Sequence, residues 1–251
     1  MDANNICQYL DWDSNFFHHR IAQVIVRRLT TESIAWIMAW CKNHAIDCLY
    51  FLADSNDVTT VRLAEDHGFR LVDIRVTLER DLTEPVKELE ETAVIVRLSN
   101  LEDIPALRAI ARTSYRYTRF YYDTHFPVAL CDALYETWIE RSCRGYADAV
   151  WVADSQEDVV GYVSCHLNGA EGRIGLVGVH IAWQGQGIAR LLILAALQWF
   201  AAQGVKKVSV VTQGRNCKAQ RLYQRCGFLT RSVELWYHRW FIELPEESQN
   251  D

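Results

Sequence analysis

The chain has 251 residues, half of them hydrophobic, and a formal net charge of −6 from 26 Lys and Arg against 32 Asp and Glu. An acidic chain without a basic cluster argues against nucleic acid or an anionic membrane as its main partner. It contains no apolar stretch long enough to span a bilayer, and its start, "MDANNICQYLDWD", does not resemble a signal peptide, so we expect a cytoplasmic protein. The eight cysteines have neither CxxC pairs nor metal-type spacing with histidine, which indicates buried thiols and no metal site.

The predicted elements mix strands and helices along the whole chain, which is typical of an α/β fold with a mixed sheet. The polar, charged segment 83–92 contains Pro85 and is predicted to be a linker between an N-terminal domain, 1–82, and a second domain, 93–251. In the first domain we expect strands at 22–29, 48–53 and 69–79 and helices at 31–44 and 58–67. In the second domain we expect strands at 93–98, 149–153, 159–166, 173–181, 207–212 and up to 241. We expect helices at 129–143, 187–202 and 217–226, and a further helix that begins at a cap, Ser99 or Asn100.

An internal repeat relates the two predicted domains. An offset of 159 residues aligns "RLAEDHGF" at 62–69 with "RLYQRCGF" at 221–228. With this offset, Gly187, which precedes the long helix of the second copy, aligns with Arg28 in the first copy. Tyr223 of "RLYQRCGF" aligns with Ala64. The first copy is therefore interpreted as partial and non-catalytic.

A glycine turn, "HIAWQGQGIARLL" at 180–192, joins the strand ending near Ile181 to the long apolar helix. A helix N-terminus carries unpaired amides and a partial positive charge, and glycines let a ligand approach these amides closely, so the turn predicts a phosphate site. It lacks the GxGxxG spacing of a dinucleotide fold and the Lys-Ser/Thr of a P-loop.

The turn and a downstream motif together resemble a known family. Gln184-x-x-Gly187-x-Ala189 resembles the Q/R-x-x-G-x-G/A motif of the GNAT superfamily of N-acetyltransferases, and "NCKAQRLYQRCGF" at 216–228 is similar to its N-x-x-A-x-x-x-Y-x-x-x-G-F motif. The resemblance covers about residues 93–241, with Ile181 where many members have proline.

Shorter segments narrow the resemblance. "LDWDSNFF", "TRF", "GYVS" and "RIGLVGV" are similar to segments of the dTDP-fucosamine N-acetyltransferases, which acetylate the amino group of a nucleotide-linked 4-amino-4,6-dideoxy sugar. These enzymes also carry a partial N-terminal domain, in agreement with the repeat. His18 stands where relatives usually have glycine.

The resemblance implies an acyltransferase that uses acetyl-CoA as co-substrate and needs no metal. It implies that Tyr223 is the general acid for the leaving thiolate. The residues that it implies for coenzyme binding are Val179, His180, Ile181, Gln184, Gly185, Gln186, Gly187, Ile188, Ala189, Asn216 and Leu222.

The acceptor side is less defined. Arg119, with Tyr121 and Tyr122, is the candidate for binding a nucleotide sugar, because Arg suits a diphosphate and aromatic rings suit a base. The general base stays open among His166, His180, Glu171 and water. Two other functions also stay open: acetylation of a different amine (a peptide N-terminus, a polyamine or an antibiotic) and a non-catalytic acyl-CoA-binding module. The expected partner is the small-molecule nucleotide-sugar substrate, and the formation of a homodimer stays open.

Overall fold

The computed structural model describes residues 6–83, 94–156 and 158–242. Two compact units divide the chain, and both are discontinuous in sequence: unit 1 comprises Met1–Arg75, Arg119–Leu130 and Val233–Asp251, and unit 2 comprises Val76–Thr118 and Cys131–Ser232. The predicted linker 83–92 lies, apart from residue 83, outside the described residues. The domain limits 1–82 and 93–251 therefore stay a prediction.

Unit 1 is a small mixed sheet with helices. Its strand order is β1, β2, β3 and the part of β10 from Val233 onward, with β2 and β3 parallel and the other pairs antiparallel. The strands are β1 (Cys7–Tyr9), β2 (Ile21–Val24), β3 (Cys48–Asp54) and β10 (Leu229–Trp240), and the helices are α1 (Asp11–Phe17), α2 (Thr31–Asn43), α3 (Val58–Asp66) and α5 (Arg119–Tyr122). β3 is buried from Cys48 to Ala53, as its continuous apolar sequence requires.

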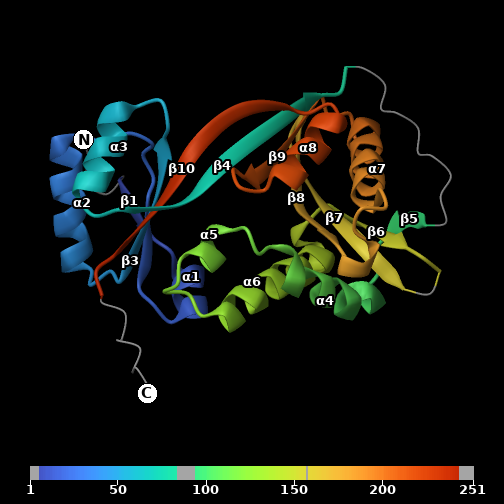
Figure 1. Cartoon of the computed structure of the whole chain (residues 1–251), viewed down its shortest axis with the longest axis horizontal. Helices are drawn as coiled ribbons and strands as arrows, with labels where there is room; N and C mark the ends of the chain where they lie inside the picture. The colour runs from blue at the N-terminus through green and yellow to red at the C-terminus, as the bar shows by residue number, and fades with distance from the viewer. Residues whose placement is uncertain (1–5, 84–93, 157, 243–251) are drawn as a thin grey trace. The chain divides into compact units, whose positions relative to one another are not determined.

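Unit 2 contains a larger mixed sheet, with strands in the order β4, β9, β8, β7, β6 and β5. The strands are β4 (Arg70–Asp81, from Val76 onward), β5 (Ile95–Leu98), β6 (Ala149–Asp154), β7 (Val159–Asn168), β8 (Glu171–Val179) and β9 (Lys207–Gln213). The helices are α4 (Ile104–Ser114), α6 (Val128–Arg141), α7 (Ile188–Ala202) and α8 (Cys217–Arg225), with short turns η2 (Leu101–Asp103), η3 (Ser142–Tyr146) and η4 (Ile181–Trp183). In Figure 1, α7 lies on one face of this sheet, and α4 and α6 lie on the other.

Burial explains this arrangement of helices. α7 is apolar nearly all round its circumference and is buried at Ile188, at every residue from Leu191 to Leu197 and at Phe200.

Asn100, one of the two predicted caps, accepts hydrogen bonds from the Glu102 and Asp103 amides at 2.8 and 3.2 Å and so starts the chain into α4.

The internal repeat is confirmed. Adding the offset of 159 to the bounds of β3, α3 and β4 reproduces the bounds of β9, α8 and β10. Asp57 caps α3 and Asn216 caps α8, each by accepting from the amide three residues on, at 3.0 and 3.1 Å. Both helices are followed by a left-handed glycine, Gly68 with φ of +74° and Gly227 with φ of +85°. The chain therefore contains two copies of the same strand–helix–strand element.

Some predicted bounds were wrong. β2 ends at Val24 rather than at residue 29; at residue 29 the Leu29 amide donates to Thr60 Oγ1 and not to a neighbouring strand. The short elements β1, α1 and α5 were not predicted. α1 ends at Phe17, and its C-cap His18 has φ of +58°, a left-handed conformation that favours glycine.

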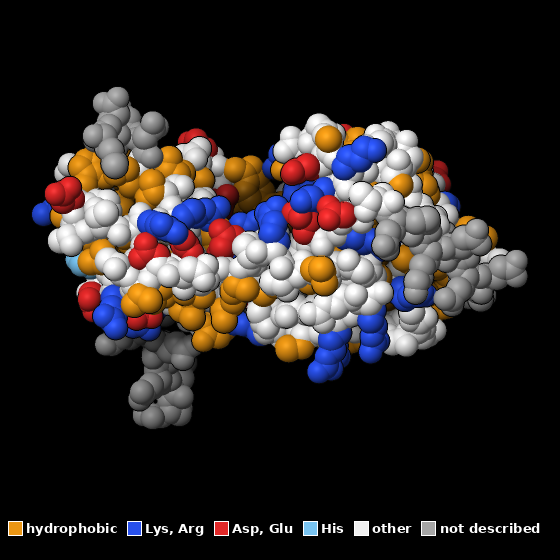
Figure 2. Space-filling model, turned by 90° about the horizontal axis from the view of Figure 1, so that it is seen from above, with side chains coloured by type: hydrophobic (Ala, Val, Ile, Leu, Met, Phe, Trp, Pro, Cys, Tyr) orange, Lys and Arg blue, Asp and Glu red, His pale blue; other side chains and the backbone are white. Residues whose placement is uncertain are grey.

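Charges are mixed on the face of the molecule drawn in Figure 2, where Lys and Arg side chains lie beside Asp and Glu side chains. In the described part of the chain, no helix has both the length and the apolar character that crossing a membrane requires.

Candidate active site

A gap opens between β8 and β9. These parallel strands pair only from Glu171–Lys207 to Ile174–Val210, whereas β8 continues to Val179 and β9 to Gln213. The register between β7 and β8 shifts just there, where Ser164 faces an extra residue of β8 and its hydroxyl accepts from the Leu176 amide at 2.8 Å. A bulge bends its strand, which accounts for the separation of the ends of β8 and β9.

Backbone donors of β8 line this gap. The His180 amide donates to Val160 of β7 at 2.8 Å, and the His180 carbonyl accepts from Trp183 at 2.8 Å. Successive amides of a strand point in opposite directions, so the Val179 amide faces away from β7 and into the gap. The backbone of His180 is thus already engaged, while Val179 can donate to a ligand.

The glycine turn presents a row of free amides. Gly185 and Gly187 have φ of +80° and +83°, which only glycine adopts readily, and Gly187 is the N-cap of α7. Within the described residues, the amides from Gly185 to Ala189 donate no hydrogen bond, whereas the Gln184 amide donates to Ile181 at 3.4 Å. The Gln184 side chain ties the turn to β8 by donating to the Val179 carbonyl at 3.1 Å. Adjacent free amides at a helix N-terminus form an anion site.

The corresponding turn of the N-terminal copy is closed by its own side chains. Thr30 caps α2 by accepting from the Ser33 amide at 3.1 Å, and the Ser33 hydroxyl accepts from the Thr30 amide at 2.8 Å. Arg28, at the position of the glycine, pairs with Asp54 at 2.8 Å. The amides that are free in α7 are therefore partly satisfied in α2.

Asn216 and Tyr223 lie on one face of α8. Asn216 caps the helix through Oδ1, and its Nδ2 has no partner among the described residues. Tyr223 is 5% exposed and belongs to the same core cluster as α7, with Leu222 packed against that cluster. The Tyr223 hydroxyl has no hydrogen-bond partner in the described chain, yet it is not among the polar atoms sealed from solvent there. Burial raises the pKa of Tyr223, so its hydroxyl is protonated at neutral pH and can donate a proton.

Comparisons with known proteins show the family of this chain. The Acetyltransferase (GNAT) family model matches residues 106–228. A dTDP-fucosamine acetyltransferase of Escherichia coli is 33% identical over 175 residues, which cover 68% of this chain and 72% of that protein. The chain belongs to the GNAT acetyltransferase family.

Other relatives match shorter parts. The spore coat polysaccharide biosynthesis protein SpsD of Bacillus subtilis is 28% identical over 138 residues, so the chain spans about half of it (48%), and a mycothiol acetyltransferase of Gordonia bronchialis is 40% identical over 68 residues, or 22% of its length. Among solved structures, a GCN5-related N-acetyltransferase from Sphaerobacter thermophilus shares the fold, with a TM-score of 0.68 and 18% identity over 95% of this chain and 78% of that one. This protein is therefore a GNAT enzyme that transfers acetyl groups, and its family uses acetyl-CoA.

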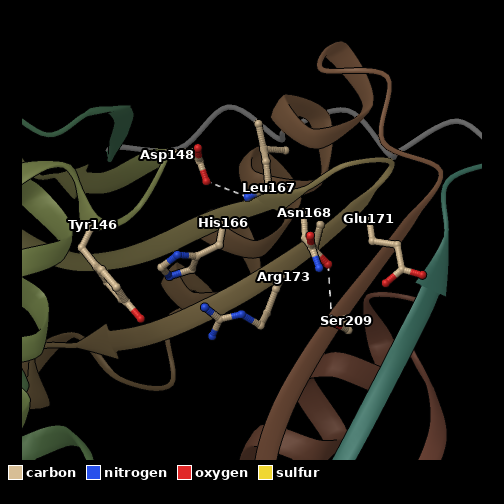
Figure 3. A pocket seen from close by; sticks show the side chains of 9 residues that line it. Tyr146, Asp148, His166, Leu167, Asn168, Glu171, Arg173 and Ser209 are labelled. Carbon is tan, nitrogen blue, oxygen red and sulfur yellow. Dashed lines mark hydrogen bonds between the residues drawn. The ribbon is translucent and has the colours of Figure 1, made fainter. Parts of the chain in front are cut away.

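Two candidate bases of this GNAT enzyme lie in a pocket at the other end of β8 (Figure 3). His166 and Glu171 line this pocket of about 380 Å³, together with Arg173 and Tyr146. Burial, together with the charge of Arg173, lowers the pKa of His166. However, His166 pairs with Arg173, six strand residues before Val179, so it lies roughly 20 Å from the Val179 amide. At that distance neither side chain can take a proton directly at the gap.

Arg119, the candidate for acceptor binding, belongs to unit 1. Its guanidinium lies over the rings of Tyr50, Phe120 and Trp236, at 4.1, 4.2 and 4.4 Å from their centroids. It forms no ion pair with any carboxylate among the described residues. Aromatic faces stabilise the cation and leave its charge available to an anionic ligand.

A hydrogen-bonded pair orients this guanidinium. Arg119 Nη1 lies 2.7 Å from His238 Nε2, and His238 Nδ1 lies 2.6 Å from Asp123. Burial lowers the pKa of His238 to about 4, so the ring is neutral; its Nδ1–H then donates to Asp123 while Nε2 accepts from Arg119. Trp240 and His125 also bond to Asp123, at 2.8 and 2.7 Å. Nothing in the sequence indicated this network, because its hydrogen bonds join residues up to 119 positions apart.

The two tyrosines that follow Arg119 differ in exposure. Tyr122 is 57% exposed, and Tyr121 is partly buried. Their predicted role in binding a nucleotide base stays a prediction. Among the described residues, no group of His, Cys, Asp and Glu is arranged to hold a metal ion.

Proposed function

We propose that this enzyme acetylates the amino group of a nucleotide-linked deoxyamino sugar, by direct attack of the amine on acetyl-CoA. The observation that carries the acceptor class is the 33% identity with a dTDP-fucosamine acetyltransferase over 72% of that protein. The similarity to a polysaccharide biosynthesis protein favours the same chemistry.

The coenzyme site of the proposal is built mainly from backbone groups. The free amides of 185–189 hold the pyrophosphate, and Nδ2 of Asn216 and the edge of β8 hold the pantetheine. Acetyl-CoA supplies the activated acetyl group. The Val179 amide donates to the thioester carbonyl and stabilises the negative charge that develops on its oxygen.

Proton transfer completes the proposed reaction. The amine lone pair forms the new C–N bond, the C–S bond breaks, and the Tyr223 hydroxyl gives its proton to the sulfur. The amine nitrogen is proposed to lose its proton to water; of the candidate bases, His166 and Glu171 lie far from the gap, and Nδ1 of His180 already accepts from the Ala182 amide at 3.3 Å.

Binding of the acceptor is proposed to use Arg119, with Tyr121 and Tyr122 beside it. The Arg119 guanidinium is oriented by His238 and forms no ion pair with a described carboxylate, which suits a diphosphate. A panel of amines tests the acceptor class: nucleotide-linked 4-amino-4,6-dideoxy sugars, polyamines, peptide N-termini and aminoglycosides, each assayed for release of coenzyme A. We expect turnover of the nucleotide sugars, and a rise of the KM for the sugar in Arg119→Gln. Preferential turnover of another amine would overturn the proposal.

We expect one coenzyme per chain. The N-terminal copy has Arg28 in place of the glycine, a self-capped helix α2, and Ala64 in place of the tyrosine. Isothermal titration with acetyl-CoA should therefore give a stoichiometry of one, and Arg28→Gly should leave it unchanged. Two equivalent sites would refute the interpretation of the first copy as non-binding.

A further inference from the structure

Two tyrosine hydroxyls meet inside unit 2. Tyr115, at the end of α4, and Tyr162, in β7, have their hydroxyl oxygens 2.9 Å apart. The ring of Tyr115 stacks on Tyr135 of α6, with centroids 4.4 Å apart and planes within 19°. Tyr135 in turn donates to Thr118 Oγ1 at 2.8 Å. Both members of the hydroxyl pair are thus held in place by packing.

The pair lies over the end of β8 that borders the gap. Tyr162 is fully buried and pairs with Gly178, the residue before Val179. A Cβ atom at Gly178 would be 2.8 Å from the Tyr162 ring and 3.0 Å from its hydroxyl oxygen, so only glycine allows this approach. The hydroxyl pair is therefore next to the amide proposed to bind the thioester.

The pair and Tyr223 belong to different sides of the sheet. A Cβ atom at Gly161 would contact Leu192 and Ile188, so Gly161 faces α7. Successive side chains of a strand alternate, which places Tyr162 on the opposite face, where it meets Tyr115 of α4. Tyr223 packs in the core cluster of α7. Tyr223, the proposed acid for the thiolate, therefore packs on the α7 side of the sheet, and the tyrosine pair on the α4 side is available to the acceptor amine.

The pair has hydrogen-bonding capacity to spare. Neither hydroxyl has a second partner among the described residues. One of the two hydrogens forms the bond between them, so one hydrogen and at least two lone pairs are unused. Burial raises the pKa of both tyrosines, so both stay protonated at neutral pH and neither acts as a base.

We propose that Tyr115 contacts the acceptor amine at the gap and that Tyr162 positions Tyr115 for this contact. The inference rests on the proposed function and assigns it a further pair of residues. Tyr115 is only partly buried, whereas Tyr162 is fully buried, so we assign the contact with the ligand to Tyr115.

The contact works through the amine N–H. A phenol oxygen that accepts one N–H turns the nitrogen lone pair toward the thioester carbon. As the C–N bond forms, the nitrogen becomes positive and its N–H a stronger donor, so the contact is tighter in the transition state than in the bound state. No proton passes to either tyrosine; the nitrogen loses its proton to water, and the sulfur receives one from Tyr223.

The test compares Tyr115→Phe, Tyr162→Phe and the double variant with the native enzyme, using the nucleotide-linked 4-amino-4,6-dideoxy sugar as acceptor. Each single change should lower kcat/KM for the sugar about tenfold or more, with acetyl-CoA affinity unchanged by calorimetry. The double variant should lose little more than Tyr115→Phe alone, because Tyr162 acts through Tyr115. Tyr135→Phe is the matched control: it breaks a hydrogen bond in the same stack and should lower the unfolding temperature without changing kcat/KM.

The outcomes separate the two proposals. If the native chain acetylates the sugar and both single variants stay within twofold of it, or if Tyr135→Phe loses as much kcat/KM as they do, the pair is structural and the inference is wrong. If the native chain binds acetyl-CoA but does not acetylate the sugar, the proposed function falls, and this inference falls with it.

Discussion

Tyr223→Phe should lower kcat by about a hundredfold or more, which is the usual effect of removing a positioned acid. The substitution keeps the buried ring and removes only the hydroxyl, which has no partner within the described residues. Because the proton is needed only as the C–S bond breaks, the loss should fall on kcat, while acetyl-CoA affinity stays near the native value. Steady-state kinetics across pH and calorimetric titration with acetyl-CoA measure the two quantities.

A second tyrosine serves as the control for this substitution. Tyr237 is as well buried in unit 1, where its hydroxyl reaches Glu65 at 3.4 Å, and it has no proposed role in the reaction. Tyr237→Phe should therefore leave kcat unchanged. A Tyr223→Phe variant with native kcat at every pH would mean that Tyr223 only packs the core and that the thiolate is protonated by water.

Gly187→Glu should weaken acetyl-CoA binding about a hundredfold, since a like charge some 4 Å from a phosphate costs on the order of several kcal/mol near a protein surface. The new carboxylate would stand at the N-cap of α7, among the free amides of the turn. Calorimetry measures the affinity, and thermal unfolding checks that the variant is folded, because a non-glycine residue at φ of +83° costs about 1–2 kcal/mol.

The far end of the same helix offers a matched control. Gly204 has φ of +76°, and a Cβ atom placed there meets nothing within 4 Å, as at Gly187. Gly204→Glu therefore introduces the same charge and a similar backbone strain away from the proposed anion site. Equal loss of affinity in the two variants, or native affinity in Gly187→Glu, would rule out the turn as the pyrophosphate site.

The local features of this site could be predicted from the sequence alone. A glycine turn before an apolar helix, the cap Asn216, and Tyr223 seven residues later on the same helix depend only on backbone preferences and on the helical period. The repeat could be predicted for the same reason, since the offset that aligns two sequence motifs also aligns the helix and strand bounds of both copies. These signals lie within single elements or between neighbouring ones.

Contacts between distant segments were decided only by the tertiary structure. The bulge at Ser164 that separates β8 from β9 depends on strand register, and the pairing of Tyr115 with Tyr162 joins residues 47 apart. The sequence indicated Arg119 as a candidate for binding a diphosphate, but its support by His238 and Asp123 depends on side chains that meet only after folding. The candidate bases His166 and Glu171 were suggested by their position in the sequence, but the extended geometry of β8 places both far from the gap. Burial and the hydrogen bonds that burial demands set these pairings, and neither is encoded in a local pattern.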